Sequence, residues 1–180
     1  MSSAAKRRQR ILDGIARAAE LAKRDPAEVQ LVAVSKGRSA DEIQTLIGTG
    51  QRDFGENRVQ EALAKWPPLI ARNGDLRLHA IGRLQSNKAA EAVKLFDTIH
   101  SLDRRSLLDG LVKEATKSGR TPSVYVQVNI GEEEQKGGCA IAEVGELAAA
   151  VSVSGSAVSG YPAIMPVAFS TITCGPVETQ

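Results

Sequence analysis

Aromatic residues are scarce in this 180-residue sequence and make up only 3% of it. Proteins that bind single-stranded nucleic acid without sequence preference stack the bases on aromatic side chains, so a platform of that kind is not expected here. The basic run Lys6-Arg7-Arg8-Gln9-Arg10 has no aromatic neighbours, and the net charge is only +2. We interpret the run as the solvated face of a first helix and predict no nucleic-acid partner.

Cysteine and histidine are equally sparse, with two of each in the chain. Cys139 and Cys174 lack the spacing of metal ligands, and no histidine–carboxylate pair has it either, so we predict no metal site. The N-terminus carries charges where a signal peptide needs an apolar run. No stretch approaches the ~20 apolar residues of a membrane span. The sequence therefore predicts a cytoplasmic protein without a membrane partner.

What the chain does contain is a regular alternation of strand and helix patterns. Apolar spacing predicts a first helix over residues 3–24, and Ser39 with Glu42 has the form of a capping box at the start of a second. Strands are expected at residues 29–35, 52–55, 76–81, 96–100 and 124–130, with a weak sixth at 158–164. Further helices are expected at residues 57–65, 86–93, 103–117 and 141–150.

This alternation predicts βαβ units and a parallel sheet, hence the α/β class. A doubly wound sheet usually has a glycine-rich turn after its first strand, and residues 35–39 have neither GxGxxG nor the P-loop pattern. A (β/α) TIM-type barrel places polar residues at the carboxyl ends of its strands. Such residues recur here at those positions: Lys36, Glu56, Asn57, Arg83, Gln85, His100, Ser101 and Asn129. The pattern favours the barrel.

Lys36 is the leading candidate for chemistry, because it follows the apolar run Leu31–Val34. In a strand it shares a face with Val32 and Val34, which we expect to be buried. Partial burial disfavours the charged form of an amine and leaves it able to attack an aldehyde or ketone, giving a Schiff base. The alternative is a lysine whose stem covers apolar surface while its head reaches water.

Other polar positions have two open explanations. His79 lies within a strand, where a hydrogen-bonded core histidine and a ligand-binding one are both possible. Asn57 could cap the helix that begins beside it, and Ser101 or Asp103 could cap the next. Ser35 has no evident partner for nucleophilic catalysis, so no catalytic residue is assigned.

Five ordered blocks of the sequence resemble the pyridoxal phosphate homeostasis protein family. They are Val34-Ser35-Lys36, Phe54-Gly55-Glu56-Asn57-Arg58-Val59-Gln60-Glu61, His79-Ala80-Ile81-Gly82-Arg83-Leu84-Gln85-Ser86-Asn87-Lys88, Ile99-His100-Ser101 and Gln127-Val128-Asn129-Ile130. The resemblance implies a barrel similar to the N-terminal domain of alanine racemase, with pyridoxal 5'-phosphate (PLP) held as a Schiff base on a lysine. That lysine falls on Lys36. Asn57, His79 and Asn129 match further motif positions near the cofactor.

The resemblance implies a homeostasis factor without an established reaction, so we predict a PLP-binding protein and no enzyme. A PLP-dependent racemase or lyase is the alternative, and it would need a second acid or base opposite the Schiff base. The only tyrosines, Tyr125 and Tyr161, lie in or near predicted strands, where packing is their default role.

The last thirty residues differ from the rest, because Glu178 is their only charged residue. A complete barrel takes about 250 residues, so this chain has room for about six βα units, and the family's phosphate-holding segments have no counterpart. We predict a partial barrel domain with its N-terminal helix at residues 1–166 and a divergent tail at 167–180. A truncated, weakly binding product is therefore a further alternative. We expect a monomer that can associate through exposed strand edges.

Overall fold

The fold is built on a five-stranded parallel sheet whose spatial order, β1-β2-β3-β4-β5, is also the chain order. A computed structural model describes residues 3–133 and 135–155. Its strands are β1 (Ala33–Val34), β2 (Asp53–Glu56), β3 (Arg77–Ala80), β4 (Thr98–Leu102) and β5 (Ser123–Val126). Each crossover moves one strand further in the same direction, which is the topology of a TIM-type barrel. The expected α/β class and incomplete barrel are confirmed.

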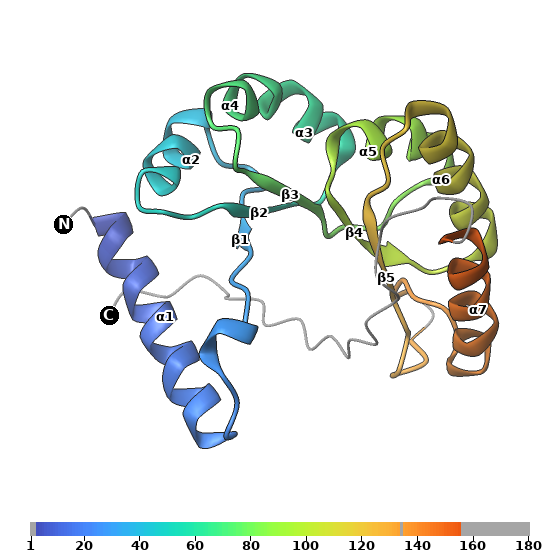
Figure 1. Ribbon diagram of the computed structural model, residues 1–180, viewed down its shortest axis with the longest axis horizontal. Helices are drawn as coiled ribbons and strands as arrows, with labels where there is room; N and C mark the ends of the chain where they lie inside the picture. Colours follow the sequence, from blue (N-terminus) through green and yellow to red (C-terminus); the bar gives the residue numbers. More distant parts are fainter. Residues whose placement is uncertain (1–2, 134, 156–180) are drawn as a thin grey trace.

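Helices connect the strands and gather on one side of the sheet (Figure 1). This layer runs from α2 to α6, while α1 lies at the β1 end of the sheet and α7 lies beside α6 and β5. The α-helices are α1 (Ser3–Leu21), α2 (Ala40–Ile47), α3 (Val59–Lys65), α4 (Pro67–Arg72), α5 (Ala89–Leu95), α6 (Arg105–Ser118) and α7 (Val144–Gly155). Short 3-10 turns lie at Pro26–Glu28, Ser86–Lys88 and Ile141–Glu143. None of the helices formed by the described residues is long and apolar enough to cross a membrane.

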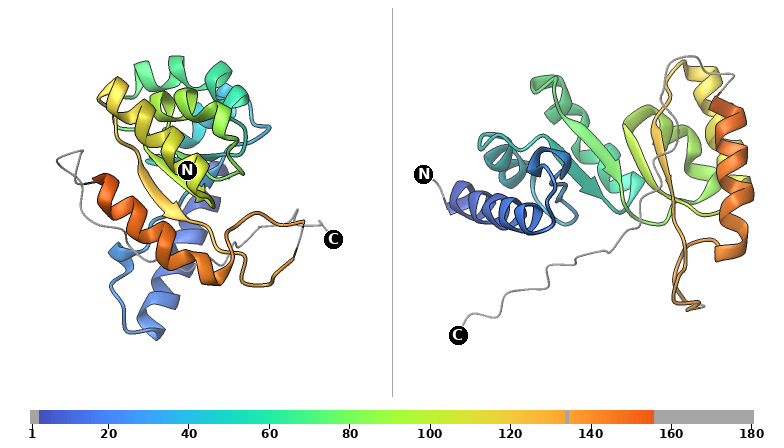
Figure 2. Two further views of the ribbon diagram at one scale, coloured as in Figure 1. Left: turned by 90° about the vertical axis from the view of Figure 1, so that its right-hand side faces the viewer. Right: turned by 60° about the horizontal axis from the view of Figure 1, so that its bottom comes forward.

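The hydrophobic core lies between the helix layer and one face of the sheet. Register partners in parallel strands share a face, and Phe54 is paired with Leu78. Both are buried, as is Ile99 of β4. Residues one position along each strand point the opposite way, to the face that would line a closed barrel. That inner face is the concave side of the sheet, opposite the layer from α2 to α6, in Figures 1 and 2.

Local sequence explains where two of the helices begin and end. Ser39 and Glu42 form the predicted capping box, since each accepts a hydrogen bond from the backbone N–H of the other. Helix α6 ends at Gly119, whose φ of 68° lies in the left-handed region that glycine adopts most readily.

The N-terminal region differs from expectation. The strand predicted at residues 29–35 shrinks to Ala33–Val34, because β1 has one neighbour among the described strands and pairs with it only at these two residues. Helix α1 forms as expected, but only Ala19 of it is buried and Ile11 is 46% exposed. Arg8, expected to be solvated, instead bonds the side chain of Gln51 and the carbonyls of Thr49 and Gly50.

Strand β4 carries an irregularity next to β5. Ile99 pairs with Val124, but the next pair joins Leu102 to Val126. Two residues of β4, His100 and Ser101, therefore stand opposite the single residue Tyr125, which is the arrangement of a β-bulge.

Four sequence predictions lie outside the described residues. They concern the sixth strand at residues 158–164, the domain boundary after residue 166, Tyr161 and Cys174.

Candidate functional site

Lys36 lies in an exposed turn just beyond the carboxyl end of β1. Its amine has no hydrogen-bond or ion-pair partner among the residues that the structure describes. The expectation that Val34 is buried is wrong, because 52% of it is exposed. Val34 is in register with Gly55, which places Val34 on the inner face. Lys36 therefore presents its amine to an open surface rather than at the end of a buried row.

The residue before Lys36 is, by contrast, firmly buried. Ser35 is 3% exposed, and its hydroxyl donates a hydrogen bond of 2.7 Å to Oε1 of Glu56. Glu56 is fully buried on the helix side of β2, where the same oxygen also accepts from Trp66 Nε1 at 2.9 Å. Lys65 of α3 completes the cluster with an Nζ–Oε1 distance of 2.7 Å. A buried carboxylate needs such a partner, because an isolated charge is costly to desolvate.

Asn57 follows β2 and lies next to the Lys36 turn in the sheet. The two strand ends are joined by a hydrogen bond from Ser35 N to Gly55 O. Asn57 is exposed and does not cap α3, because the N-cap position belongs to Arg58. Its backbone is held closely by the loop after β3: a Cβ on Gly82 would lie 2.3 Å from the carbonyl oxygen of Asn57. The side chain of Asn57 is exposed at the carboxyl edge of the sheet.

His79 belongs to a row of polar groups that crosses the inner face. It is 5% exposed, and its Nε2 lies 3.1 Å from Oδ1 of Asp53 while its Nδ1 lies 2.9 Å from Nε2 of His100. Tyr125 continues the row, with its ring centroid 4.9 Å from that of His100. Both ring nitrogens of His79 therefore have partners within the protein, and its place near the cofactor stays a prediction.

Charge in this row fixes the histidine tautomers. Burial favours protonation of Asp53, but the hydrogen bonds from Arg77 and His79 outweigh it and hold the pKa of Asp53 below its usual value. An ionised Asp53 accepts a hydrogen bond from Nε2–H of His79, so Nδ1 of a neutral His79 must accept a hydrogen bond from Nε2–H of His100. Burial lowers the pKa of His79, and burial together with the charge of His79 lowers the pKa of His100 to about 4.

We expect this histidine pair to make stability depend on pH. The folded-state pKa values lie below the reference value of 6.5, so the unfolded chain binds more protons and the free energy of unfolding falls from about pH 6.5 to about pH 4. Urea unfolding across this range measures the slope. His100→Gln keeps an N–H donor for His79 but does not titrate, and it should give a flatter profile. An unchanged slope would show that His100 is not responsible.

Asn129 lies beyond β5, at the opposite end of the described sheet from Lys36. Its side-chain amide donates to the carbonyl of Glu133 at 3.0 Å and accepts from the Glu133 N–H at 3.3 Å. Asn129 is half-buried and shapes its own loop. The structure thus brings Lys36 and Asn57 together at neighbouring strand ends, places His79 deeper on the inner face and leaves Asn129 several strands away.

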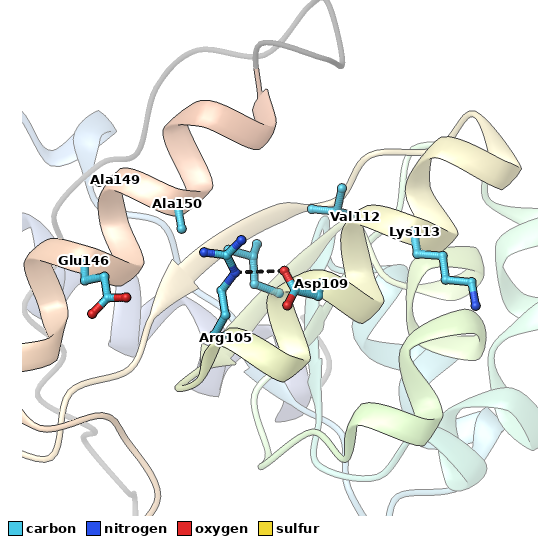
Figure 3. Close-up of a pocket in the computed structure, with 8 residues that line it drawn as sticks. Arg105, Asp109, Val112, Lys113, Glu146, Ala149 and Ala150 are labelled. Carbon is cyan, nitrogen blue, oxygen red and sulfur yellow. Dashed lines mark hydrogen bonds and ion pairs between the residues drawn. The ribbon is translucent and has the colours of Figure 1, made fainter.

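One groove lies away from these residues. A groove of about 520 Å³ separates α6 from α7 and is open to solvent (Figure 3). Its lining is Arg105, Leu108, Asp109, Val112, Lys113, Glu146, Ala149 and Ala150. No predicted site residue contributes to it. No cluster of three or more potential metal ligands occurs within residues 3–133 and 135–155.

Comparison with known proteins identifies the fold family. A family model described as the alanine racemase N-terminal domain matches residues 8–168. The chain belongs to this family. Membership agrees with the sequential parallel sheet.

Within the alanine racemase N-terminal domain family, the chain is similar to proteins named pyridoxal phosphate homeostasis protein. It is 41% identical over 152 residues to that of Pseudomonas aeruginosa, covering 84% of this chain and 65% of the relative. It is 40% identical over 136 residues to that of Aquifex aeolicus, covering 76% and 59%. The resemblance drawn from the sequence is confirmed. The chain spans about three fifths of the length of these relatives.

A solved structure supports the same grouping. PipY of Synechococcus elongatus PCC7942, solved with PLP bound, matches with a TM-score of 0.61 and 41% sequence identity. The match covers 74% of this chain and 63% of PipY.

The structure reveals a cluster that the sequence analysis missed. Glu56 was noted only as a polar residue at a strand end, and Glu61, Lys65 and Trp66 were assigned no part in a site. Glu61 and Lys65 are four residues apart, a spacing that places both on one face of α3. Nothing in the sequence shows that this face meets the Lys36 turn.

Proposed function

We propose that this chain binds PLP, takes part in PLP homeostasis and holds the cofactor as a Schiff base on Lys36. The observation that carries the proposal is an exposed, unpaired Lys36 amine at the carboxyl edge of the described sheet, on a turn whose preceding residue is buried. The names of the relatives and the PLP bound to PipY support it.

Lys36 and Asn57 have functional groups that suit the aldehyde end of the cofactor. When bound, PLP supplies an aldehyde carbon that joins a primary amine with loss of water. Lys36 would provide that amine, and the adjacent Asn57 has an exposed amide suited to the polar substituents of the ring. We propose that His79 and Asn129 act indirectly, since both side chains are already engaged within the protein.

We propose a binding role rather than an enzymatic one. A racemase or lyase needs a second acid or base that is free to exchange a proton with its substrate. His79 is paired with Asp53 and His100, and Tyr125 lies against the His100 ring. Incubation with amino acids in deuterated water tests this assignment. Exchange at the α-carbon well above that caused by free PLP would favour the enzyme.

Lys36→Ala is expected to abolish the visible absorption band that forms when PLP is added to the protein. The reason is that the substitution removes the amine and leaves the surrounding turn otherwise unchanged. Borohydride reduction followed by peptide mass spectrometry should locate the cofactor on Lys36 in the unmodified sequence. Lys113→Ala, which removes an exposed lysine from α6, is the control and should keep the band.

A band that survives Lys36→Ala at full strength would remove Lys36 from its assigned role. No band in either protein would contradict the binding function itself.

A further inference from the structure

The turn that carries Lys36 is anchored on both sides by helix α3. Before Lys36, the carbonyl of Ser35 accepts a hydrogen bond of 2.8 Å from Lys65 Nζ. After it, the N–H of Gly37 donates a bond of 2.7 Å to Oε1 of Glu61. The peptide units flanking Lys36 are therefore tied to two side chains of one helix.

The same two side chains are tied to each other and to the core. Lys65 Nζ lies 3.2 Å from Oε1 of Glu61 and 2.7 Å from Oε1 of Glu56. Lys65 is 10% exposed and Glu56 is fully buried, so this lysine joins a surface carboxylate to a buried one. The hydrogen bond from Gly37 and the contact with Lys65 hold the pKa of Glu61 below its usual value. Glu61 therefore stays ionised, and charge-assisted bonds of this kind are stronger than neutral ones.

Fixing the backbone on both sides of a reactive residue has a chemical benefit. A long lysine side chain loses conformational entropy when its amine is held in a covalent bond. If the backbone is already fixed, it loses no further entropy, so the total entropy lost on binding is smaller. Gly37 has a φ of 67°, so the turn adopts a left-handed conformation immediately after Lys36. The bond from Gly37 N–H to Glu61 holds that conformation.

We propose that Glu61 and Lys65 are positioning residues for Lys36, which hold its turn so that PLP bonds there rather than at other lysines. The inference rests on the proposed function, and it gives a role to two residues of α3 to which neither the sequence blocks nor the binding role assigned one. Glu61 is the better one to test, because its side chain is 34% exposed and its removal leaves the buried Glu56–Lys65 pair intact.

The experiment uses three variants of the whole chain. Glu61→Ala removes the acceptor, Glu61→Gln retains a neutral acceptor, and Gln60→Ala is a matched control at the exposed preceding position of α3. The first readout needs no cofactor: amide hydrogen exchange at Gly37, measured by NMR. The second uses PLP: after borohydride reduction, peptide mass spectrometry gives the share of label on Lys36 relative to other lysines.

We expect Glu61→Ala to speed exchange at Gly37 by about tenfold, the effect of losing a hydrogen bond to a charged group, and to shift label from Lys36 to other lysines. Glu61→Gln should recover part of both effects, and Gln60→Ala should match the unmodified chain. A Glu61→Ala variant with unchanged Gly37 exchange and unchanged label distribution would overturn the proposal. If the unmodified chain takes up no PLP, the binding function fails, while the exchange measurement still decides whether Glu61 holds the turn.

Discussion

Replacing Lys65 with methionine is expected to lower the free energy of unfolding by about 3 kcal/mol, the lower end of the range for breaking a buried ion pair. Methionine fills a similar volume but leaves Glu56 without its cation. Glu56 is fully buried, and only its Oε1 has hydrogen-bond partners among the described residues, whereas its Oε2 has none. The stability of the carboxylate therefore depends on three donors at one oxygen: Ser35 Oγ, Lys65 Nζ and Trp66 Nε1.

Chemical unfolding of Lys65→Met beside the double variant Glu56→Gln/Lys65→Met measures this dependence. Neutralising Glu56 removes the unpaired charge, so the double variant should regain part of the lost stability. Lys113→Met, on the exposed side of α6, controls for the general effect of exchanging lysine for methionine. A Lys65→Met chain as stable as the control would show that Glu56 does not require its cation.

Gly82→Ala is the second change for which we expect a large effect, about 2 kcal/mol of destabilisation from overpacking. The added Cβ would lie 2.3 Å from the carbonyl oxygen and 2.8 Å from the Cα of Asn57. Both atoms are backbone, so rotation of a side chain cannot relieve the clash. The segment carrying Asn57 must move, and we expect binding of PLP to weaken along with stability.

Thermal unfolding and PLP titration of Gly82→Ala measure the two effects separately. Gly74→Ala is the matched control, because a Cβ at Gly74 meets no atom within 4 Å. Equal melting temperatures for the two variants would contradict the close approach of Gly82 to Asn57.

The strands of the sheet that have two neighbours were predicted well from the sequence. Leu78 and Ile99 each lie between two polar residues, an alternation typical of a strand with one face in the core, and both are buried against the helix layer with Phe54. For β1 the apolar run predicted a strand that is too long and a buried Val34. A run of apolar residues does not show how many neighbouring strands will pair with it. Val34 has the sequence environment of a core residue but lies on the inner face, where 52% of it is exposed.

The sequence indicates where single site candidates lie along the chain, but it does not indicate the contacts that join them to other elements. Lys36 and Asn57 lie at strand ends, a position that the alternation of elements predicts directly. The partners that hold the Lys36 turn come from α3, and contacts between a helix and a preceding loop depend on how the helix is rotated on the sheet. The link between His79 and His100 depends on strand register, which the sequence alone does not give.

The bulge in β4 places one additional residue between Ile99 and Leu102, so the number of residues in this strand determines which side chains reach the inner face. Because His100 and Ser101 together oppose Tyr125, the residues beyond the bulge are shifted by one position relative to simple alternation. Leu102 can therefore face the core on the same side as Ile99, although three positions separate them. Deleting one of the two bulge residues would restore regular pairing. It would also remove either His100, and with it the contact to His79, or the buried Ser101. A relative that differs here by a single deletion would thus differ in the site even if every named side chain were retained.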